Sequence, residues 1–145
     1  MVFEIVGVVI IGLVVGSFLN VCIYRIPRGK DIVSPPSACP NCETKIRPYD
    51  NIPVLSYIIL RGRCRYCNNS ISFKYPLIEI LNALLYYLCY QSFGLGFHLL
   101  IIFAFVSSMI VITFIDLEFQ IIPDAITLPG IIIGLVSASF IFPDP

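Results

Sequence analysis

The sequence predicts an α-helical integral membrane protein with about four spanning helices and a small zinc-ribbon-like insertion. Of the 145 residues, 58% are hydrophobic and only 12% are charged, and four cysteines form two CxxC pairs. The mean hydropathy is +0.93. Soluble domains average about 45–50% apolar and about 25% charged residues. The composition therefore excludes a disordered chain and argues against a water-soluble globular domain.

The charged residues are distributed unevenly along the chain. All nine Lys and Arg residues lie between Arg25 and Lys74, and this segment holds three acids, so it carries +6 and the rest of the chain carries −6. We therefore expect three parts: a first transmembrane helix at 1–24, a basic domain at 25–75, and further transmembrane helices at 76–145.

Four apolar stretches are candidates for spanning helices: 3–24, 76–90, 97–115 and 125–142. A spanning helix needs about 20 residues, so the second stretch is short for one. The positive-inside rule places the basic domain in the cytoplasm, and alternation of the spans returns 116–124 to the same side. In the first stretch, the small residues of Gly12-x-x-x-Gly16 allow another helix of this chain to approach closely.

The two CxxC pairs, Cys39–Cys42 and Cys64–Cys67, predict a structural zinc site. Two residues between thiolates let one turn present both sulfurs to one ion, and a second such turn completes a tetrahedron. A domain of about fifty residues rarely builds a sufficient core alone, and a metal supplies the missing stability. Four cysteine ligands leave no open coordination position, so we expect no catalysis by the metal.

Three other interpretations of these cysteines stay open: two disulfides, unmetallated thiols, or a redox pair. A reducing cytoplasm argues against disulfides. The remaining two cysteines, Cys22 and Cys89, lie in apolar stretches, and we expect them to be small buried hydrophobes.

Several motifs in order resemble those of the type IV prepilin peptidases, a family of membrane aspartic proteases. The N-terminal signature is Gly-Ser-Phe-Leu-Asn-Val-Cys-Ile-Tyr-Arg-Ile-Pro, and the cysteine pairs and a later Ile-Asp-Leu-Glu-Phe-Gln-Ile-Ile-Pro-Asp segment follow it. The segments that carry the resemblance are 16–27, 49–56, 60–67, 75–79 and 115–124. They extend over almost the whole chain.

The resemblance implies an activity, a location and a set of site residues. Family members cleave the leader from type IV prepilins and pseudopilins at the cytoplasmic side of the bacterial inner membrane, and many then N-methylate the new N-terminus with S-adenosylmethionine. Two membrane aspartates catalyse the cleavage, and Asp116 occupies the position of the first. The four cysteines match a cytoplasmic metal-binding insertion. Independently of the resemblance, an ionisable residue at a membrane boundary is a functional candidate.

The family's second aspartate lies in a Gly-x-Gly-Asp motif that this sequence lacks, since Phe97 follows Gly94-Leu95-Gly96. An aspartic protease needs two carboxylates that share a site. Asp124 and Glu79 are the candidate supporting acids. Their alternative roles are an N-terminal helix cap for Asp124 and an interfacial carboxylate at a helix start for Glu79. We therefore expect an N-terminal part of the enzyme, inactive alone, whose partner is a missing C-terminal half or a companion chain.

The alternative function is a non-catalytic, membrane-anchored zinc-ribbon module that binds a partner. It accounts for the cysteines and the charge, but not for the resemblance of 116–124. Nucleic-acid binding is disfavoured by the membrane tether, although aromatic residues of the basic domain could stack on bases. The basic domain is expected instead to shape the cytoplasmic entrance or to contact anionic lipid headgroups of the bilayer. No S-adenosylmethionine motif is readable.

Overall fold

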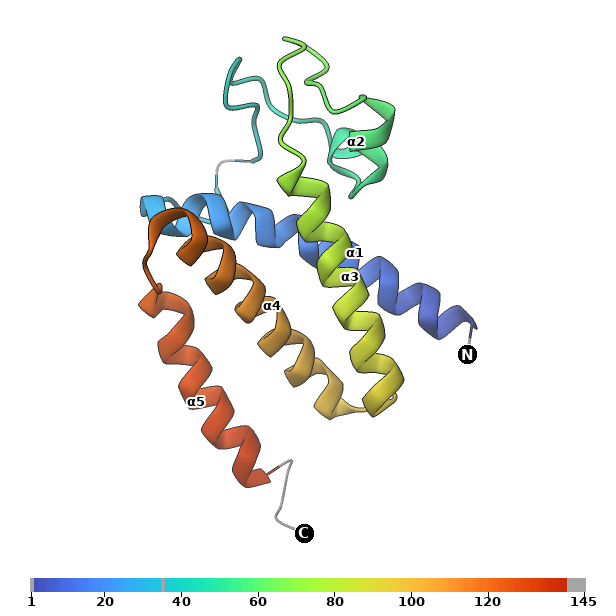
Figure 1. The fold of residues 1–145 in the computed structure, drawn as a ribbon, viewed down its shortest axis with the longest axis vertical. Coiled ribbons are helices and arrows are strands. Elements are labelled where there is room, and N and C mark those ends of the chain that lie inside the picture. The colour runs from blue at the N-terminus through green and yellow to red at the C-terminus, as the bar shows by residue number, and fades with distance from the viewer. Residues whose placement is uncertain (1, 35, 141–145) are drawn as a thin grey trace.

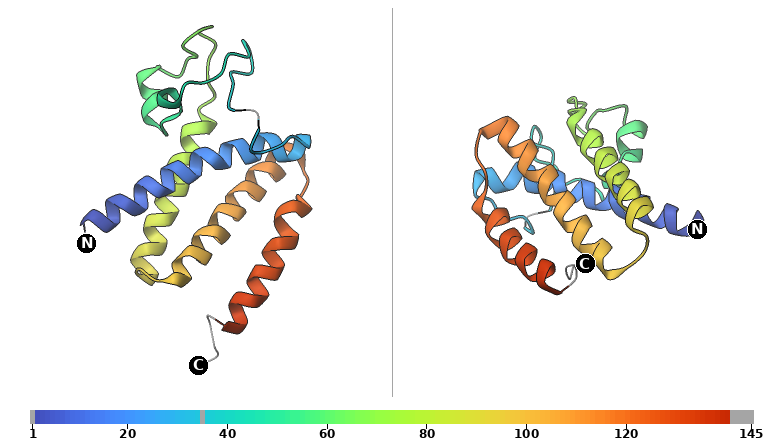
Figure 2. Two further views of the ribbon diagram at one scale, coloured as in Figure 1. Left: turned by 180° about the vertical axis from the view of Figure 1, so that it is seen from behind. Right: turned by 60° about the horizontal axis from the view of Figure 1, so that its bottom comes forward.

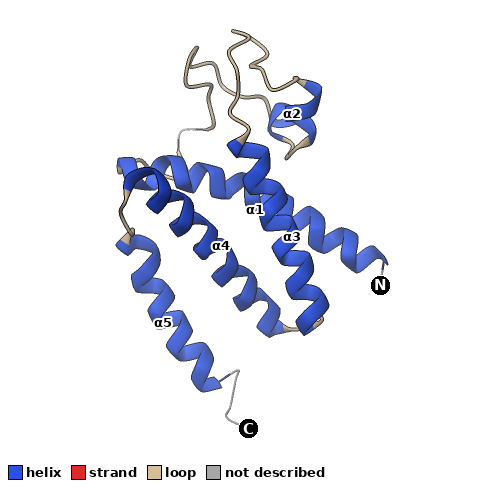
Figure 3. Cartoon of the chain, viewed as in Figure 1, coloured by secondary structure: helices blue, strands red, loops and turns tan. Residues whose placement is uncertain are grey.

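The computed structural model describes residues 2–34 and 36–140, and every regular element within these ranges is a helix (Figures 1 and 3). The α-helical fold class is thereby confirmed. The elements are α1 (Val2–Arg25), η1 (Ile26–Arg28), η2 (Pro48–Asn51), α2 (Leu55–Ile59), α3 (Lys74–Phe93), α4 (Phe97–Phe119) and α5 (Asp124–Phe140). The last two residues of the fourth expected span, 141 and 142, lie outside the described residues.

The long helices form a bundle with the basic domain at one end. α3 leaves that domain and runs to the far end, α4 returns, and α5 descends beside α4, while α1 crosses near the domain (Figures 1 and 2). Gly94 ends α3 with a φ of 69°, and its N–H donates to the Tyr90 carbonyl at 2.9 Å. Glycine adopts a positive φ at little steric cost, which lets a three-residue connector reverse the chain.

α1 and α3 are in backbone contact at two glycines. A Cβ atom placed on Gly12 would lie 2.6 Å from the Cα of Ala83, and one on Gly16 would lie 2.7 Å from the Cα of Glu79. Atoms this close overlap, so no other residue fits at either position without moving a helix. The expected close approach of helices at these glycines thus occurs between α1 and α3 of the same chain.

A buried amide connects three helices where α1 and α3 meet. Asn82 of α3 is completely buried. Its Nδ2 donates to the Gly12 carbonyl of α1 at 2.7 Å, and its Oδ1 accepts from the Ser107 hydroxyl of α4 at 3.3 Å. The Tyr86 and Ser107 hydroxyls are 2.8 Å apart. Because these side chains and the Gly12 carbonyl form hydrogen bonds with one another, polar groups can be buried between the three helices.

Two of the described helices are long and apolar enough to cross a membrane: α1 continued through η1, Val2–Arg28, and α4, Phe97–Phe119. α5 is also apolar over Asp124–Ala138, but this stretch is shorter. The spans expected at 3–24 and 97–115 therefore have suitable helices, whereas those expected at 76–90 and 125–142 stay predictions.

Replacing Gly12 with Ala should destabilise the bundle, because the new methyl group meets the backbone of Ala83. Overpacking of this kind costs about 1–3 kcal/mol. The measurement is thermal unfolding of the purified chain in detergent, with Gly7→Ala as the matched control. Nothing lies within 4 Å of a Cβ on Gly7, so this variant should be neutral or slightly more stable. Equal melting temperatures for the two variants would contradict the close contact.

Candidate functional site

The first CxxC pair is held in a tight turn by backbone hydrogen bonds. The Cys39 N–H donates to the Thr44 carbonyl at 3.0 Å, and the Glu43 N–H donates back to the Cys39 carbonyl at 2.9 Å. Glu43, directly after the pair, has a φ of 55°. This turn points the sulfurs of Cys39 and Cys42 toward the same side.

The second pair repeats the same turn 25 residues later in the chain. The Cys64 N–H donates to the Asn69 carbonyl at 2.9 Å, the Asn68 N–H donates to the Cys64 carbonyl at 3.0 Å, and Asn68 also has a φ of 55°. Each turn is closed by a single antiparallel bridge, Ala38 to Lys45 in the first and Arg63 to Ser70 in the second. Over its described residues, the ribbon-like insertion thus holds two similar knuckles with isolated bridges in place of extended strands, and η2 and α2 lie between them.

The two knuckles bring the four sulfurs together as the sequence predicted. The Sγ atoms of Cys39 and Cys67 are 3.8 Å apart, those of Cys42 and Cys64 are 4.0 Å apart, and all four lie within 4.8 Å of one another. Zn–S bonds of about 2.3 Å in a tetrahedron place the sulfurs about 3.8 Å apart. A disulfide would require about 2.05 Å, and these cysteines are free thiols. The donor set therefore fits one tetrahedral metal ion.

The thiols of this cluster differ in acidity. Burial raises the pKa of the Cys39 thiol to about 11. Hydrogen bonds from Thr44 lower the pKa of Cys42 to about 6, and the backbone N–H of Cys67 lowers the pKa of Cys64. Thiolates are the metal-binding form, so the lowered pKa values of Cys42 and Cys64 favour metal binding, whereas the raised pKa of Cys39 opposes it in the metal-free cluster.

An ion pair that the sequence did not predict supports the second knuckle. Arg65, inside the second CxxC pair, donates two hydrogen bonds to Asp50 at 2.8 and 2.6 Å. The Arg65 guanidinium lowers the pKa of the Asp50 carboxyl. This bidentate contact joins η2 to the cysteine cluster.

Glu79 is buried beneath the basic domain. Its side chain is 7% exposed, and its Oε2 accepts a hydrogen bond from the Val54 N–H at 2.7 Å. Val54 has a φ of 59°, a strained conformation for a β-branched residue, and it precedes α2. The carboxylate expected to support catalysis is thus engaged with the loop that starts α2.

Asp116 lies in the last turn of α4, at the end of the apolar stretch expected at 97–115. α4 continues to Phe119, and the Asp116 carbonyl accepts from the Gln120 N–H at 2.8 Å. The Asp116 side chain is exposed in the last turn of the helix. A carboxylate there is disfavoured by the helix dipole, which argues against a purely structural role.

Asp124 is the first residue of α5 and is exposed. The backbone N–H groups of Ile126 and Thr127 donate to the carbonyl of Pro123 at 3.1 and 3.2 Å. Pro123 therefore takes the N-cap position expected for Asp124. Asp124 lies in the first turn, where a negative charge is favourable.

The acidic ends of α4 and α5 lie at the end of the bundle that carries the basic domain (Figure 1). Lys74, which begins α3, forms an ion pair with Glu118 at 2.7 Å, and the Arg28 guanidinium carbon lies 5.1 Å from the centre of the Phe119 ring. Within the described residues, the cysteines form the one group of three or more His, Cys, Asp or Glu side chains close enough to hold a metal ion.

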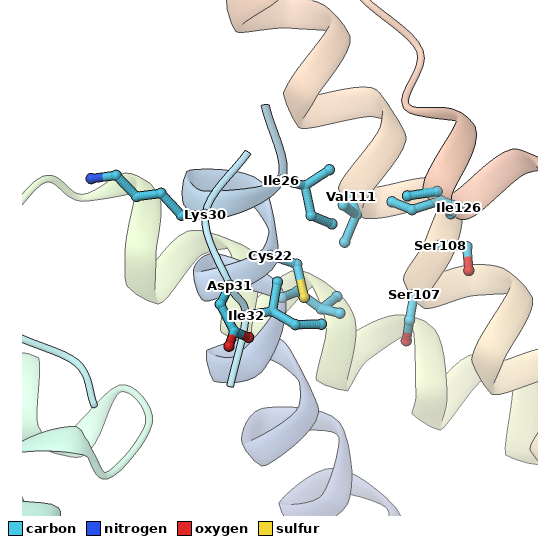
Figure 4. Close-up of a pocket in the computed structure, with 11 residues that line it drawn as sticks. Cys22, Ile26, Lys30, Asp31, Ile32, Ser107, Ser108, Val111 and Ile126 are labelled. Carbon is cyan, nitrogen blue, oxygen red and sulfur yellow. The ribbon is translucent and has the colours of Figure 1, made fainter. Parts of the chain in front are cut away.

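A cavity of about 540 Å³ opens at this end, between α1, α4 and α5 (Figure 4). Its wall is apolar on the α1 and α5 sides, with two hydroxyls from α4 and one charge of each sign from the segment after η1. The lining residues that Figure 4 labels are Cys22, Ile26, Lys30, Asp31, Ile32, Ser107, Ser108, Val111 and Ile126. No motif in the sequence indicated this cavity, because its walls come from four separate segments.

Comparison with known proteins gives a consistent set of relatives. The chain is 44% identical over 129 residues to a protein from Myxococcus xanthus (strain DK1622), covering 89% of this chain and 38% of the relative. It is 38% identical to a protein from Neisseria gonorrhoeae and 37% identical to one from Pseudomonas putida, covering 88% of this chain in both cases and 53% and 52% of the relatives. All three are named prepilin leader peptidase/N-methyltransferase.

The chain thus spans about half or less of the length of the curated relatives it matches. No solved structure matches it at a significant level. A family model described as the bacterial peptidase A24 N-terminal domain matches residues 10–93, which is more than half of the chain. The chain therefore belongs to the bacterial A24 peptidase family, and the resemblance to prepilin peptidases that its motifs carry is confirmed.

Proposed function

We propose that this chain works as part of a membrane aspartic endopeptidase that removes the leader from type IV prepilins or pseudopilins. The relatives named prepilin leader peptidase/N-methyltransferase support the activity. The observation that carries the assignment to this chain is Asp116, an exposed carboxylate in the last turn of an apolar helix at the domain-bearing end of the bundle.

Peptide hydrolysis by this chemistry needs two carboxylates in different protonation states. An ionised carboxylate takes a proton from the attacking water, and a protonated one donates a proton to the peptide group. We propose that Asp116 supplies one of them. Glu118 is paired with Lys74 and Glu79 is engaged with Val54. Asp124, on the same end of the bundle, is then the candidate supporting acid within the chain, and a segment outside residues 1–145 is the proposed source of the second catalytic aspartate.

We propose that Cys39, Cys42, Cys64 and Cys67 hold a structural zinc ion. The support is the separation of their sulfurs, which suits tetrahedral coordination. When bound, the ion supplies folding free energy to a domain with little core of its own. In this proposal the carboxylates, and not the zinc ion, carry out the hydrolysis.

The proposed location is the bacterial inner membrane, with several spans and with 25–75 and 116–124 on the cytoplasmic side. The apolar surfaces of α4 and α5 support it, because their large exposed side chains, such as Leu100, Phe105 and Ile132, favour contact with acyl chains. N-methylation with S-adenosylmethionine is part of the proposal through the relatives' name alone, and we assign no residue of this chain to that cofactor.

Asp116→Asn should strongly slow leader removal in an active enzyme built on this chain. We expect residues 1–145 alone, in proteoliposomes, not to cleave a prepilin. A fusion to the remaining part of the Myxococcus xanthus relative should cleave it. In the fusion, Asp116→Asn should lower the cleavage rate by about 10²- to 10⁴-fold, the usual contribution of a general acid or base.

The readout is the mass of the prepilin product. Asp124→Asn is the matched control, because this carboxyl lies at the same end of the bundle, and its supporting role predicts a smaller loss. Cleavage by residues 1–145 alone would contradict the need for a further aspartate. A fusion that folds but never cleaves would favour the non-catalytic binding module.

Cys64→Ser should lower the bound zinc of the purified chain from one ion to a substoichiometric amount, because three thiolates close the site less well than four. Cys89→Ser is the control, since Cys89 lies in α3 outside the cluster. Elemental analysis together with thiol counting decides. Zinc-free protein with the four cysteines recovered as disulfides would contradict the proposed site.

Glu79→Gln should keep the basic domain in place, because an amide oxygen still accepts the Val54 N–H, whereas Glu79→Ala should release it. Limited proteolysis within 26–73 measures the release. Measuring prepilin cleavage by Glu79→Gln and Glu79→Ala in the fusion protein distinguishes a role in holding the domain from a role in catalysis. If Glu79 supplies a proton, Glu79→Gln should lose cleavage activity while resisting proteolysis like the unmodified chain.

A further inference from the structure

The short helix α2 presents an apolar face to the outside of the basic domain. Leu55, Ile58 and Ile59 are 50%, 64% and 65% exposed, and their spacing places them on one side of the helix. Tyr57, on another side, holds the helix to the domain: its ring packs edge-on against Phe73, and its hydroxyl donates to the Ile71 carbonyl at 3.3 Å. The exposed side chains are therefore presented by a helix that is anchored from within.

α2 lies near the end of the helix bundle where α3 leaves the basic domain. α3 begins at Lys74, and Glu79 lies five residues further, about 7.5 Å along the helix axis at 1.5 Å per residue. Because Glu79 binds the Val54 N–H, the start of α2 lies within side-chain reach of the first turns of α3. Figures 1 and 2 show α2 next to the domain-bearing end of α3. Amphipathic helices at a bilayer surface bury their apolar face about 5–10 Å deep, in the boundary between headgroups and acyl chains. The exposed apolar face of α2 suits that layer.

Positive charge follows directly after α2. A cavity of about 550 Å³ lies beside it, and apolar, basic and polar side chains all line it: Ile59, Leu60, Arg61, Arg63, Cys64, Arg65 and Asn68. Arg61 and Arg63 are exposed, whereas Arg65 is paired with Asp50. Arginine matches the geometry of phosphate through two parallel hydrogen bonds. An apolar wall next to two exposed arginines is complementary to an anionic phospholipid.

We propose that α2 lies in the interfacial layer of the bilayer, with Leu55, Ile58 and Ile59 among the upper acyl chains and with Arg61 and Arg63 on the phosphates of anionic lipids. This inference rests on the membrane placement proposed above. It assigns the domain two attachments, one to α3 through Glu79 and one to the lipid through α2. The cysteine cluster is then held at a constant height over the bundle.

The test uses the absence of tryptophan from the sequence. A single tryptophan is introduced into the full chain as Ile58→Trp and reconstituted into vesicles of brominated phospholipid with a fraction of anionic lipid. We expect the tryptophan emission to be blue-shifted. We expect the bromine atoms to quench about half of its intensity, since the tryptophan would lie at the boundary between headgroups and acyl chains. Tyr66→Trp, on the second knuckle, is the control and should respond to aqueous acrylamide instead.

A third probe separates this inference from the membrane placement itself. Phe105 is 65% exposed on α4, so Phe105→Trp should be quenched by brominated lipid if α4 spans the bilayer. Quenching of Phe105→Trp without quenching of Ile58→Trp overturns the interfacial position of α2 alone. The same holds if Ile58→Trp is shielded from both quenchers, which would indicate a protein segment on α2. No quenching of Phe105→Trp overturns the membrane placement.

The role of the two arginines has its own measurement. Arg61→Gln combined with Arg63→Gln in the Ile58→Trp chain should weaken the quenching in anionic vesicles to the level seen in zwitterionic ones. Quenching that is equal in both lipids and unchanged by the double substitution would overturn the phosphate contact.

Discussion

The backbone contact between α1 and α3 at Gly12 and Gly16 sets the positions of the other helices. With no side chain between the two backbones, the Asn82 amide reaches the Gly12 carbonyl and still holds Ser107 of α4. A buried amide without such partners costs several kcal/mol in an apolar environment. The polar groups therefore favour one arrangement of three helices, and the apolar residues around them fill the remaining space.

The same face of α3 also positions the basic domain. Glu79, Asn82 and Ala83 are spaced by three and four residues and so lie on one side of the helix, against α1. Glu79 continues this polar line outward to the Val54 N–H. The strained backbone at Val54 persists because a buried carboxylate satisfies its donor, and strain of this kind needs surrounding structure to maintain it.

Local patterns predicted the long apolar helices and the cysteine cluster, because hydropathy and CxxC spacing are properties of short segments. The polar residues at 118–120 were expected to interrupt the apolar stretch, and α4 does end at Phe119. The partner of Glu118 was not predictable from local pattern, because Lys74 lies 44 residues away in sequence. The Val54 partner of Glu79 was not predictable either, because almost every residue type has a backbone N–H and the sequence does not show which one is used.

Two contacts in the first turns of α3 relate the cysteine domain to the proposed catalytic segment. Glu79 holds the loop that starts α2, and Lys74 holds Glu118, two residues from Asp116 in the last turn of α4. The domain also meets α4 directly, because Arg28 lies over the Phe119 ring. In the proposed enzyme, a structural metal would stabilise a domain that these contacts join to α3 and to the last turn of α4, where Asp116 lies.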